Sequence, residues 1–277
     1  MASVVKNQFY NDGFIVIEKL LKNTDSANIL SQCERIFENQ FKNADIVKKK
    51  KVNKSFHDLL HYLYTNEKKL FFSASKQIQK IPLLFEIQTN KKIIDLLGSI
   101  NISNPLISYT PLILFNSKFL NKYKTPPHQD WRSMQGSLDS VVIWVALQDV
   151  CDGFGNLEII PRSHKFGLMK TKKDDWFRSI SDKNIAKDSN FVSFKLNKGD
   201  AIIFSSFLIH RTGINESNDI RWSMQFRYNN LEEKSFIKRG YPDPYVHKPL
   251  HKILHKNFPS KSKLENFFQD INESHKK

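Results

Sequence analysis

The sequence predicts a mainly β fold, a barrel or jelly roll with helices packed outside it. Up to about residue 100, apolar residues recur at the spacing of amphipathic helices, whereas the chain after Asn101 breaks into short β-rich runs separated by turns. Short strands that follow one another in this way are typical of sandwiches and barrels. Because no helices alternate with these strands, a doubly wound parallel sheet is not expected.

The expected helices lie in the first third of the chain. In the first of them Ile29, Cys33 and Phe37 share one face. Asp25 or Ser26 is its expected N-cap. The predicted helices span residues 25–40, 55–64, 74–88 with an interruption near Pro82, and 91–97, where Gly98 ends the last one.

The expected strands begin with a short apolar run after the Asp12-Gly13 turn. They span residues 14–17, 112–115, 140–147, 157–160, 191–196, 201–204 and 221–228. Since no linker marks a boundary, we expect one domain over residues 1–277. It comprises a helical part of about 1–100, a β core of about 101–230 and a C-terminal extension over 231–277, whose last stretch, 260–277, is expected to be a frayed helix or tail.

The composition describes a folded protein without membrane spans. Hydrophobic residues make up 40% of the 277 residues, and the 22 Phe and 4 Trp argue against disorder. No apolar run reaches the roughly 18 residues of a membrane span, and residues 1–10 lack a signal peptide's apolar stretch. We therefore expect a cytoplasmic protein, with Cys33 and Cys151 reduced.

The net charge of +15 raises the question of nucleic acid. The lysines are spread along the chain, with one block at residues 48–51, whereas nucleic-acid binders usually gather charge on one face and interleave aromatic residues. We therefore interpret the charge as solvated surface and expect no nucleic-acid partner. Attraction of an anionic substrate or polymer is the alternative.

The segment 125–131 carries the most informative motif. His128 and Asp130 lie two residues apart, a spacing that on an extended strand points both side chains to one face. A second histidine, His210, follows 210 − 128 = 82 residues later. Two histidines and one carboxylate form the facial triad of non-haem iron(II) oxygenases, whereas zinc is more often held tetrahedrally. An H-x-D pair alone is structural at least as often.

The strand over residues 221–228 has two different faces. Large apolar residues occupy one face, which suits packing against helices. The other face carries Arg221, Ser223, Gln225 and Arg227. A filled barrel core would not tolerate two unpaired arginines, so this face predicts an open barrel with an anionic ligand. Arginine binds a carboxylate bidentately, and Ser223 adds a hydrogen bond.

The sequence resembles the phytanoyl-CoA dioxygenase family of iron(II)- and 2-oxoglutarate-dependent oxygenases, from about residue 8 to 245. The matching pieces are Asp12-Gly13-Phe14, His128-Gln129-Asp130, Trp144, Gly155-Asn156-Leu157-Glu158, Ile160-Pro161-Arg162-Ser163-His164, Gly199-Asp200, His210 and Arg221. The resemblance implies a double-stranded β-helix, the cupin-like jelly roll. It also implies that His128, Asp130 and His210 bind iron.

The resemblance further implies a 2-oxoglutarate site. Arg221 would pair with the distal carboxylate, and Ser223 would assist. Thr212 matches a family Ser or Thr that contacts the co-substrate, and Trp144 matches an aromatic residue that lines the pocket. A further contact on the strand before H-x-D falls within residues 112–116 and stays unassigned.

The substrate contacts are the least defined part of the prediction. Arg132, Gln135 and Arg227 are the candidates. Arg162 departs from the family, which often has Gly in a PGSH turn, and could place a cation at the mouth of the site. The rim therefore looks polar and cationic, which favours a small hydrophilic or anionic substrate.

Other histidines are rival ligands. His164 follows a proline-containing turn and has no arginine at the right interval after it, so a hydrogen-bonded rim residue is the better interpretation. His247, His251 and His255 occur four apart, but Pro249 interrupts that helical spacing, and we expect an exposed segment.

Three function classes follow. The first is a dioxygenase that uses iron(II), 2-oxoglutarate and O2 to hydroxylate a C–H bond of a small molecule, releasing succinate and CO2. Family variants that halogenate lack the carboxylate ligand, and Asp130 is present. The second is a catalytically inactive barrel that binds ligand. The third is a nucleic-acid binder, which would show a steep salt dependence. The oligomeric state stays open.

Overall fold

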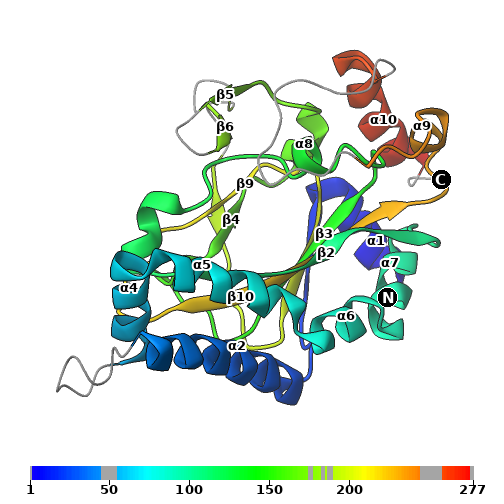
Figure 1. Cartoon of the computed structure of the whole chain (residues 1–277). Coiled ribbons are helices and arrows are strands. Elements are labelled where there is room, and N and C mark those ends of the chain that lie inside the picture. The colour runs from blue at the N-terminus through cyan, green and yellow to red at the C-terminus, as the bar shows by residue number, and fades with distance from the viewer. Residues whose placement is uncertain are drawn as a thin grey trace.

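The computed structural model describes residues 2–44, 55–173, 177–181, 185, 190–243 and 258–274. Its centre is a pair of antiparallel sheets (Figure 1). The larger sheet has the order β1 (Phe14–Ile17), β8 (Ala201–Ser205), β3 (Val141–Ala146), β10 (Arg221–Asn230), β2 (Pro105–Asn116). The smaller has the order β7 (Val192–Ser193), β4 (Leu157–Ile159), β9 (His210–Thr212), and a hairpin pairs β5 (Thr171–Lys173) with β6 (Arg178–Ile180). The predicted antiparallel β core with flanking helices is thus confirmed.

Helices surround this core. They are α1 (Ala2–Asp12), α2 (Asn23–Asn43), α4 (Phe56–Asn66), α5 (Lys68–Gln77), α6 (Pro82–Gln88), α7 (Lys91–Ser99), α8 (Trp131–Met134), α9 (Lys234–Lys238) and α10 (Lys261–Ser274), with 3-10 turns η1 (Ile78–Lys80), η2 (Lys118–Tyr123) and η3 (Ser163–Phe166). The predicted interruption near Pro82 is confirmed, since Ile81 before it is extended and α6 restarts at the proline.

Two predictions of helix ends were wrong. Helix α2 begins at Asn23 with Lys22 as N-cap, so Asp25 lies in its first turn and is no cap. Helix α7 runs through Gly98, because the left-handed residue that ends it is Asn101, with φ of 66°.

The C-terminal end of the described chain is a packed helix and not a frayed tail. Leu264 and Phe268 of α10 are buried in a cluster with Trp131 and Phe207. Through this cluster α10 packs against the short helix α8, which follows directly after Asp130.

Two apolar layers enclose the large sheet. All six residues of β3 are buried, because both faces of the strand are covered. Ile143 packs with the helices on the outer face, where α2, α4, α5 and α6 lie (Figure 1). Val142, Trp144 and Ala146 face the smaller sheet together with Leu157. The polar side chains of the candidate site described below lie in this second, inner layer.

Phe37 of α2 joins the helical layer to the sheet. It is fully buried, and its ring contacts those of Phe56, Phe71, Phe115 and Trp222. We expect Phe37→Ala to lower the free energy of unfolding by about 3–5 kcal/mol, since it removes apolar burial and leaves a cavity. Urea denaturation followed by circular dichroism measures this loss.

Phe72 offers the matched control on the neighbouring helix α5. Its side chain is 53% exposed, so Phe72→Ala should change the free energy of unfolding by about 0.5 kcal/mol or less. Equal losses in the two variants would contradict the role given to Phe37.

Candidate metal centre and co-substrate pocket

The two predicted histidine ligands face each other across one β-bridge. The backbone N–H of His128 donates to the carbonyl of His210 at 3.0 Å, and the reverse bond measures 3.1 Å. Such a doubly bonded antiparallel pair fixes both Cα atoms closely. Backbone hydrogen bonds therefore bring together two histidines that are 82 positions apart in the sequence.

Asp130 reaches the same place by a different local structure from the one predicted. His128 lies on a one-residue bridge, and the chain then turns, so that Asp130 has helical dihedral angles and starts α8. The turn is held from outside, because the Trp131 N–H donates to the carbonyl of Ser206 at 2.9 Å. The prediction of one extended strand through both residues was wrong, although the side chains do converge.

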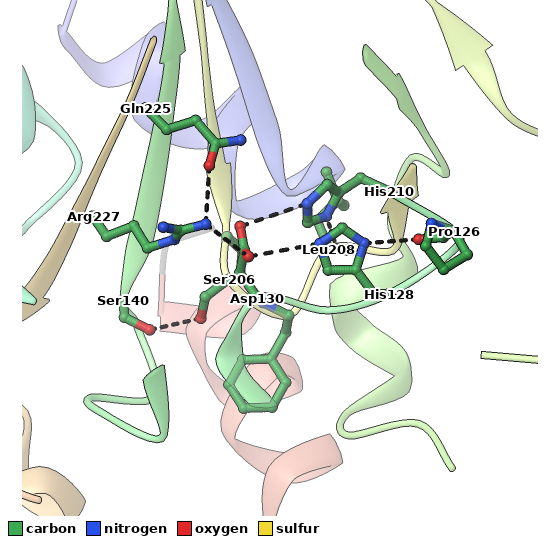
Figure 2. A network of polar contacts seen from close by, with 11 residues as sticks. Pro126, His128, Asp130, Ser140, Ser206, Leu208, His210, Gln225 and Arg227 are labelled. Atoms are coloured by element: carbon green, nitrogen blue, oxygen red, sulfur yellow. Dashed lines mark hydrogen bonds and ion pairs between the residues drawn. The ribbon is translucent and has the colours of Figure 1, made fainter. Parts of the chain in front are cut away.

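The three side chains form a compact, buried group. Asp130 Oδ1 lies 3.7 Å from His128 Nε2, and Oδ2 lies 3.5 Å from His210 Nε2. One ligand atom from each residue falls within 4.8 Å of the others. In the described part of the chain this is the one cluster of three His, Cys, Asp or Glu side chains with that spacing. Figure 2 shows them pointing toward a common centre.

Hydrogen bonds orient both imidazole rings. His128 Nδ1 lies 2.9 Å from the carbonyl oxygen of Pro126, and His210 Nδ1 lies 2.9 Å from that of Leu208 (Figure 2). A carbonyl can only accept, so each Nδ1 donates its proton and each Nε2 keeps a free lone pair. Metal-ligating histidines are typically oriented in this way.

Charges around Asp130 keep it ionised. Arg227 Nη2 lies 3.2 Å from Asp130 Oδ1 and also donates to Gln225 Oε1 at 2.9 Å. Burial alone would raise the pKa of Asp130, but Arg227 and the two histidines outweigh it and hold that pKa well below its usual range. Burial lowers the pKa of His210 to about 3. At neutral pH the group therefore offers an anionic carboxylate and a neutral imidazole.

One buried oxygen is left over in this arrangement. Asp130 Oδ2 has no hydrogen-bond partner, whereas Arg227 binds Oδ1. A buried carboxylate oxygen without a partner is costly, and a cation between it and the Nε2 atoms removes that cost. The two imidazoles and one carboxylate are the donor set that suits iron(II), so the residues fit the implied metal.

A cavity of about 600 Å³ opens beside this group. Its lining includes the three candidate ligands together with Arg221, Trp144 and further side chains from β2, α4 and α5. Volumes of this size bind small molecules and cofactors.

Arg221 is a buried cation that lines the cavity. Its Nε donates to the Gly155 carbonyl at 3.0 Å, Nη1 donates to Ser223 Oγ, and the guanidinium carbon lies 5.3 Å from the centre of the Trp144 ring. Burial lowers the pKa of Arg221 to about 10. Among the described residues no carboxylate forms an ion pair with it. A buried charge calls for a partner, and an anionic ligand in the cavity supplies one.

Gly155 permits this position of Arg221. Its φ of 72° is left-handed, and a Cβ there would lie 2.3 Å from Asn116 Nδ2. The glycine of the Gly155-Asn156-Leu157-Glu158 motif thus lets the backbone approach both the guanidinium and β2.

A family model described as phytanoyl-CoA dioxygenase (PhyH) matches residues 9–223. The chain belongs to the phytanoyl-CoA dioxygenase family. Peroxisomal phytanoyl-CoA dioxygenase of Bos taurus is 24% identical over 271 residues, which cover 92% of this chain and 77% of that protein. Methylphosphonate hydroxylase of Gimesia maris is 26% identical over 137 residues, 48% of this chain and 51% of that protein.

Solved structures show the same fold. The epimerase SnoN in complex with Fe3+, alpha ketoglutarate and nogalamycin RO superposes with a TM-score of 0.57 at 17% identity, covering 92% of this chain and 97% of that one. The non-heme monooxygenase ThoJ gives 0.58 at 14% identity, covering 98% and 96%. The predicted double-stranded β-helix is thus confirmed. Membership in the phytanoyl-CoA dioxygenase family likewise confirms the predicted enzyme class, an iron(II)- and 2-oxoglutarate-dependent dioxygenase.

The residues predicted to contact 2-oxoglutarate divide into two groups. Arg221, Trp144 and Thr212 line the cavity. Ser223 does not, and its hydroxyl instead accepts from Arg221. The range 112–116, where the phytanoyl-CoA dioxygenase family has a further contact, ends in Asn116, which lines the cavity and lies opposite Arg221 in the β2–β10 register.

Arg132 and Gln135, predicted as substrate contacts, do not line the cavity. Arg132 is buried on α8, where its Nη2 donates to the carbonyl of Met169. Gln135 follows α8 with φ of 45° and donates to the Arg132 carbonyl at 3.2 Å. The turn after Asp130 directs both side chains away from the metal group. Arg227, the third candidate, does line the cavity but binds Asp130.

The remaining motif residues lie outside the cavity. Arg162 takes φ of 66°, which explains why the phytanoyl-CoA dioxygenase family often has Gly there, and its side chain is exposed. His164 Nε2 lies 3.1 Å from the Tyr10 carbonyl, and burial lowers its pKa to about 4. His164 is therefore a hydrogen-bonded residue, as predicted, but it lies in the core and not at the rim. His247, His251 and His255 lie outside the described residues.

Sequence reasoning missed the helical wall of the cavity. Lys68, Phe71 and Gln79 come from α5 and η1, and Lys124 follows η2. Gln79 also fixes this wall to β2, because it accepts from the Ile113 N–H and donates to its carbonyl. An amphipathic pattern shows which residues face inward but not whether they meet protein or a cavity.

None of the helices in the described part of the chain combines the length and apolar composition that a membrane crossing requires.

Proposed function

We propose that His128, Asp130 and His210 bind iron(II), that Arg221 binds 2-oxoglutarate, and that the enzyme hydroxylates a C–H bond of a small organic substrate. The observation that carries this proposal is the pairing of two incomplete groups in one cavity. Asp130 presents a buried oxygen without a partner, and Arg221 presents a buried cation without a carboxylate among the described residues. A metal ion and a dicarboxylate complete both.

The chain's own residues would divide the work of positioning. Arg221 binds the distal carboxylate, with Ser223 and Gly155 fixing the guanidinium and Trp144 packing beside it. Thr212 lines the same cavity and offers a hydroxyl. Iron(II), 2-oxoglutarate and O2 together supply the oxidising chemistry, with succinate and CO2 as products.

Arg227 would select which oxygen of Asp130 meets the metal. Because its guanidinium holds Oδ1, Oδ2 is the oxygen left for coordination. Oδ2 and the Nε2 atoms of His128 and His210 would then hold the ion. When bound, it would supply the chemistry that activates O2 together with the co-substrate. With Asp130 in place as the third protein ligand, hydroxylation is the expected outcome.

Anaerobic titration with iron(II) and 2-oxoglutarate tests the proposal. We expect a visible charge-transfer band that saturates at one equivalent of each, because one triad and one Arg221 lie in the cavity. Admission of O2 should then produce succinate. Iron and 2-oxoglutarate that bind without any succinate formation would favour the inactive, ligand-binding alternative, and absence of the band would contradict the site itself.

A further inference from the structure

We propose that the mouth of the cavity is an anion-binding subsite in which Lys68 and Lys124 bind the acidic group of an amphipathic substrate. The apolar body of that substrate would lie along an aromatic wall that leads to the metal group. This inference rests on the proposed function, because it assigns the outer part of the same cavity. It keeps the anionic part of the expected hydrophilic or anionic substrate and replaces the hydrophilic part.

The cavity has a buried floor and an open mouth. His210 at the floor is 2% exposed, whereas Phe72 and Tyr123, which line the same cavity, are 53% and 45% exposed. Lys68, one turn before Phe72 on α5, is also exposed. A substrate therefore enters past α5 and η2 with its reactive carbon directed inward and the other end near the lysines.

The wall between mouth and floor is largely apolar. Phe71, Phe72, Leu114, Phe115 and Phe177 contribute to it from α5, β2 and the segment before β6. Phe72 and Leu114 of this wall are 53% and 36% exposed. Exposed apolar side chains that gather in a concave site mark a binding surface for an apolar group. A sugar-like or fully hydrophilic molecule would leave this wall without a partner. An aliphatic or aromatic body covers it.

The side chains that line the cavity carry more positive than negative charges. Asp130 is the one carboxylate among the described lining residues, and Arg227 already binds it. Arg221 is assigned to 2-oxoglutarate. Lys68 and Lys124 remain, and neither forms an ion pair with a carboxylate in the described parts of the chain.

Two cations at the mouth of a low-dielectric cavity attract anions and repel cations. The chemical class that satisfies both the lysines and the wall is an amphipathic organic anion. Carboxylates and phosphate monoesters share this chemistry, and the experiment below separates them.

Isothermal titration of the anaerobic, iron- and 2-oxoglutarate-loaded protein with matched ten-carbon probes tests the subsite. We expect decanoate to bind about tenfold more tightly than decanol, because two partly exposed charges each contribute a modest attraction. The preference should fall as salt is raised. Shortening the carboxylate should weaken binding by about fourfold per methylene. Decyl phosphate in a third arm separates a phosphate site from a carboxylate site.

The chain supplies its own controls. The double variant K68A/K124A should lose the preference for decanoate over decanol, and K69A/K122A should keep it. Lys69 follows Lys68 and Lys122 lies two residues before Lys124, but neither lines the cavity. Both double variants should keep the charge-transfer band. Equal binding of decanoate and decanol to the wild type, or equal losses in the two double variants, would overturn the proposal.

The proposed function can fail separately. If no charge-transfer band forms, the same titrations in protein without added iron still compare K68A/K124A with K69A/K122A. A preference lost only in the first variant would support the subsite even then, and its absence would overturn it.

Discussion

His210→Ala is expected to abolish the charge-transfer band and to reduce succinate formation to background. His210 supplies one of three proposed ligand atoms, and its Nδ1 is already committed to the Leu208 carbonyl, so no other group replaces its Nε2. Loss of a residue that merely orients a ligand typically weakens metal affinity roughly 10–100-fold, and loss of the ligand itself should exceed that. Iron binding is measured by anaerobic titration and by metal analysis after desalting.

His164 is the control for this variant. It is also buried, but it bonds to the Tyr10 carbonyl and lies outside the cavity. His164→Gln should therefore keep both the band and iron stoichiometry. Retention of the band in His210→Ala together with its loss in His164→Gln would show that the ligand set is wrong.

Arg221→Ala is expected to raise the KM for 2-oxoglutarate by at least about 30-fold while iron alone still binds. Truncating one partner of a buried, hydrogen-bonded charge pair costs about 2–5 kcal/mol, because the other charge is left buried and unpaired. Iron binding should persist because none of the hydrogen bonds and ring contacts of Arg221 in the described structure involves the three proposed metal ligands. Steady-state succinate formation against 2-oxoglutarate concentration gives the KM.

Two further variants frame this result. Arg221→Lys should recover part of the affinity, because an ammonium is a point charge and cannot bind a carboxylate bidentately. Arg211→Ala should leave the KM unchanged, since Arg211 pairs with Glu158 and does not line the cavity. An unaltered KM in Arg221→Ala would remove Arg221 from the 2-oxoglutarate site.

The sequence pattern was most informative where a residue's side of a strand decides its role. On β10 the predicted alternation is confirmed: Trp222 and Met224 pack in the outer layer, and Arg221 and Arg227 line the cavity. Period-two alternation follows directly from strand geometry, so it survives errors in strand boundaries. The convergence of His128 with His210 was predicted because several strands fit between them.

The pattern failed where distant contacts set the local backbone. Asp130 leaves the extended conformation because the next N–H bonds to Ser206, which is 76 residues away from it. That turn then carried Arg132 and Gln135 away from the cavity. Lys68 and Lys124 were missed for a related reason, since only the tertiary packing of α5 against β2 brings these segments to the same mouth.

We expect the bridge between His128 and His210, as the two proposed iron ligands, to link iron supply to the lifetime of the protein. The two ligands are adjacent only when the strands that carry them are paired, so an ion that binds both favours the folded chain over the unfolded one. At a free concentration of 100 times Kd, such an ion adds about 2.7 kcal/mol to the free energy of unfolding. Cells short of iron would then contain less of this enzyme as well as less active enzyme, because unfolded chains are degraded.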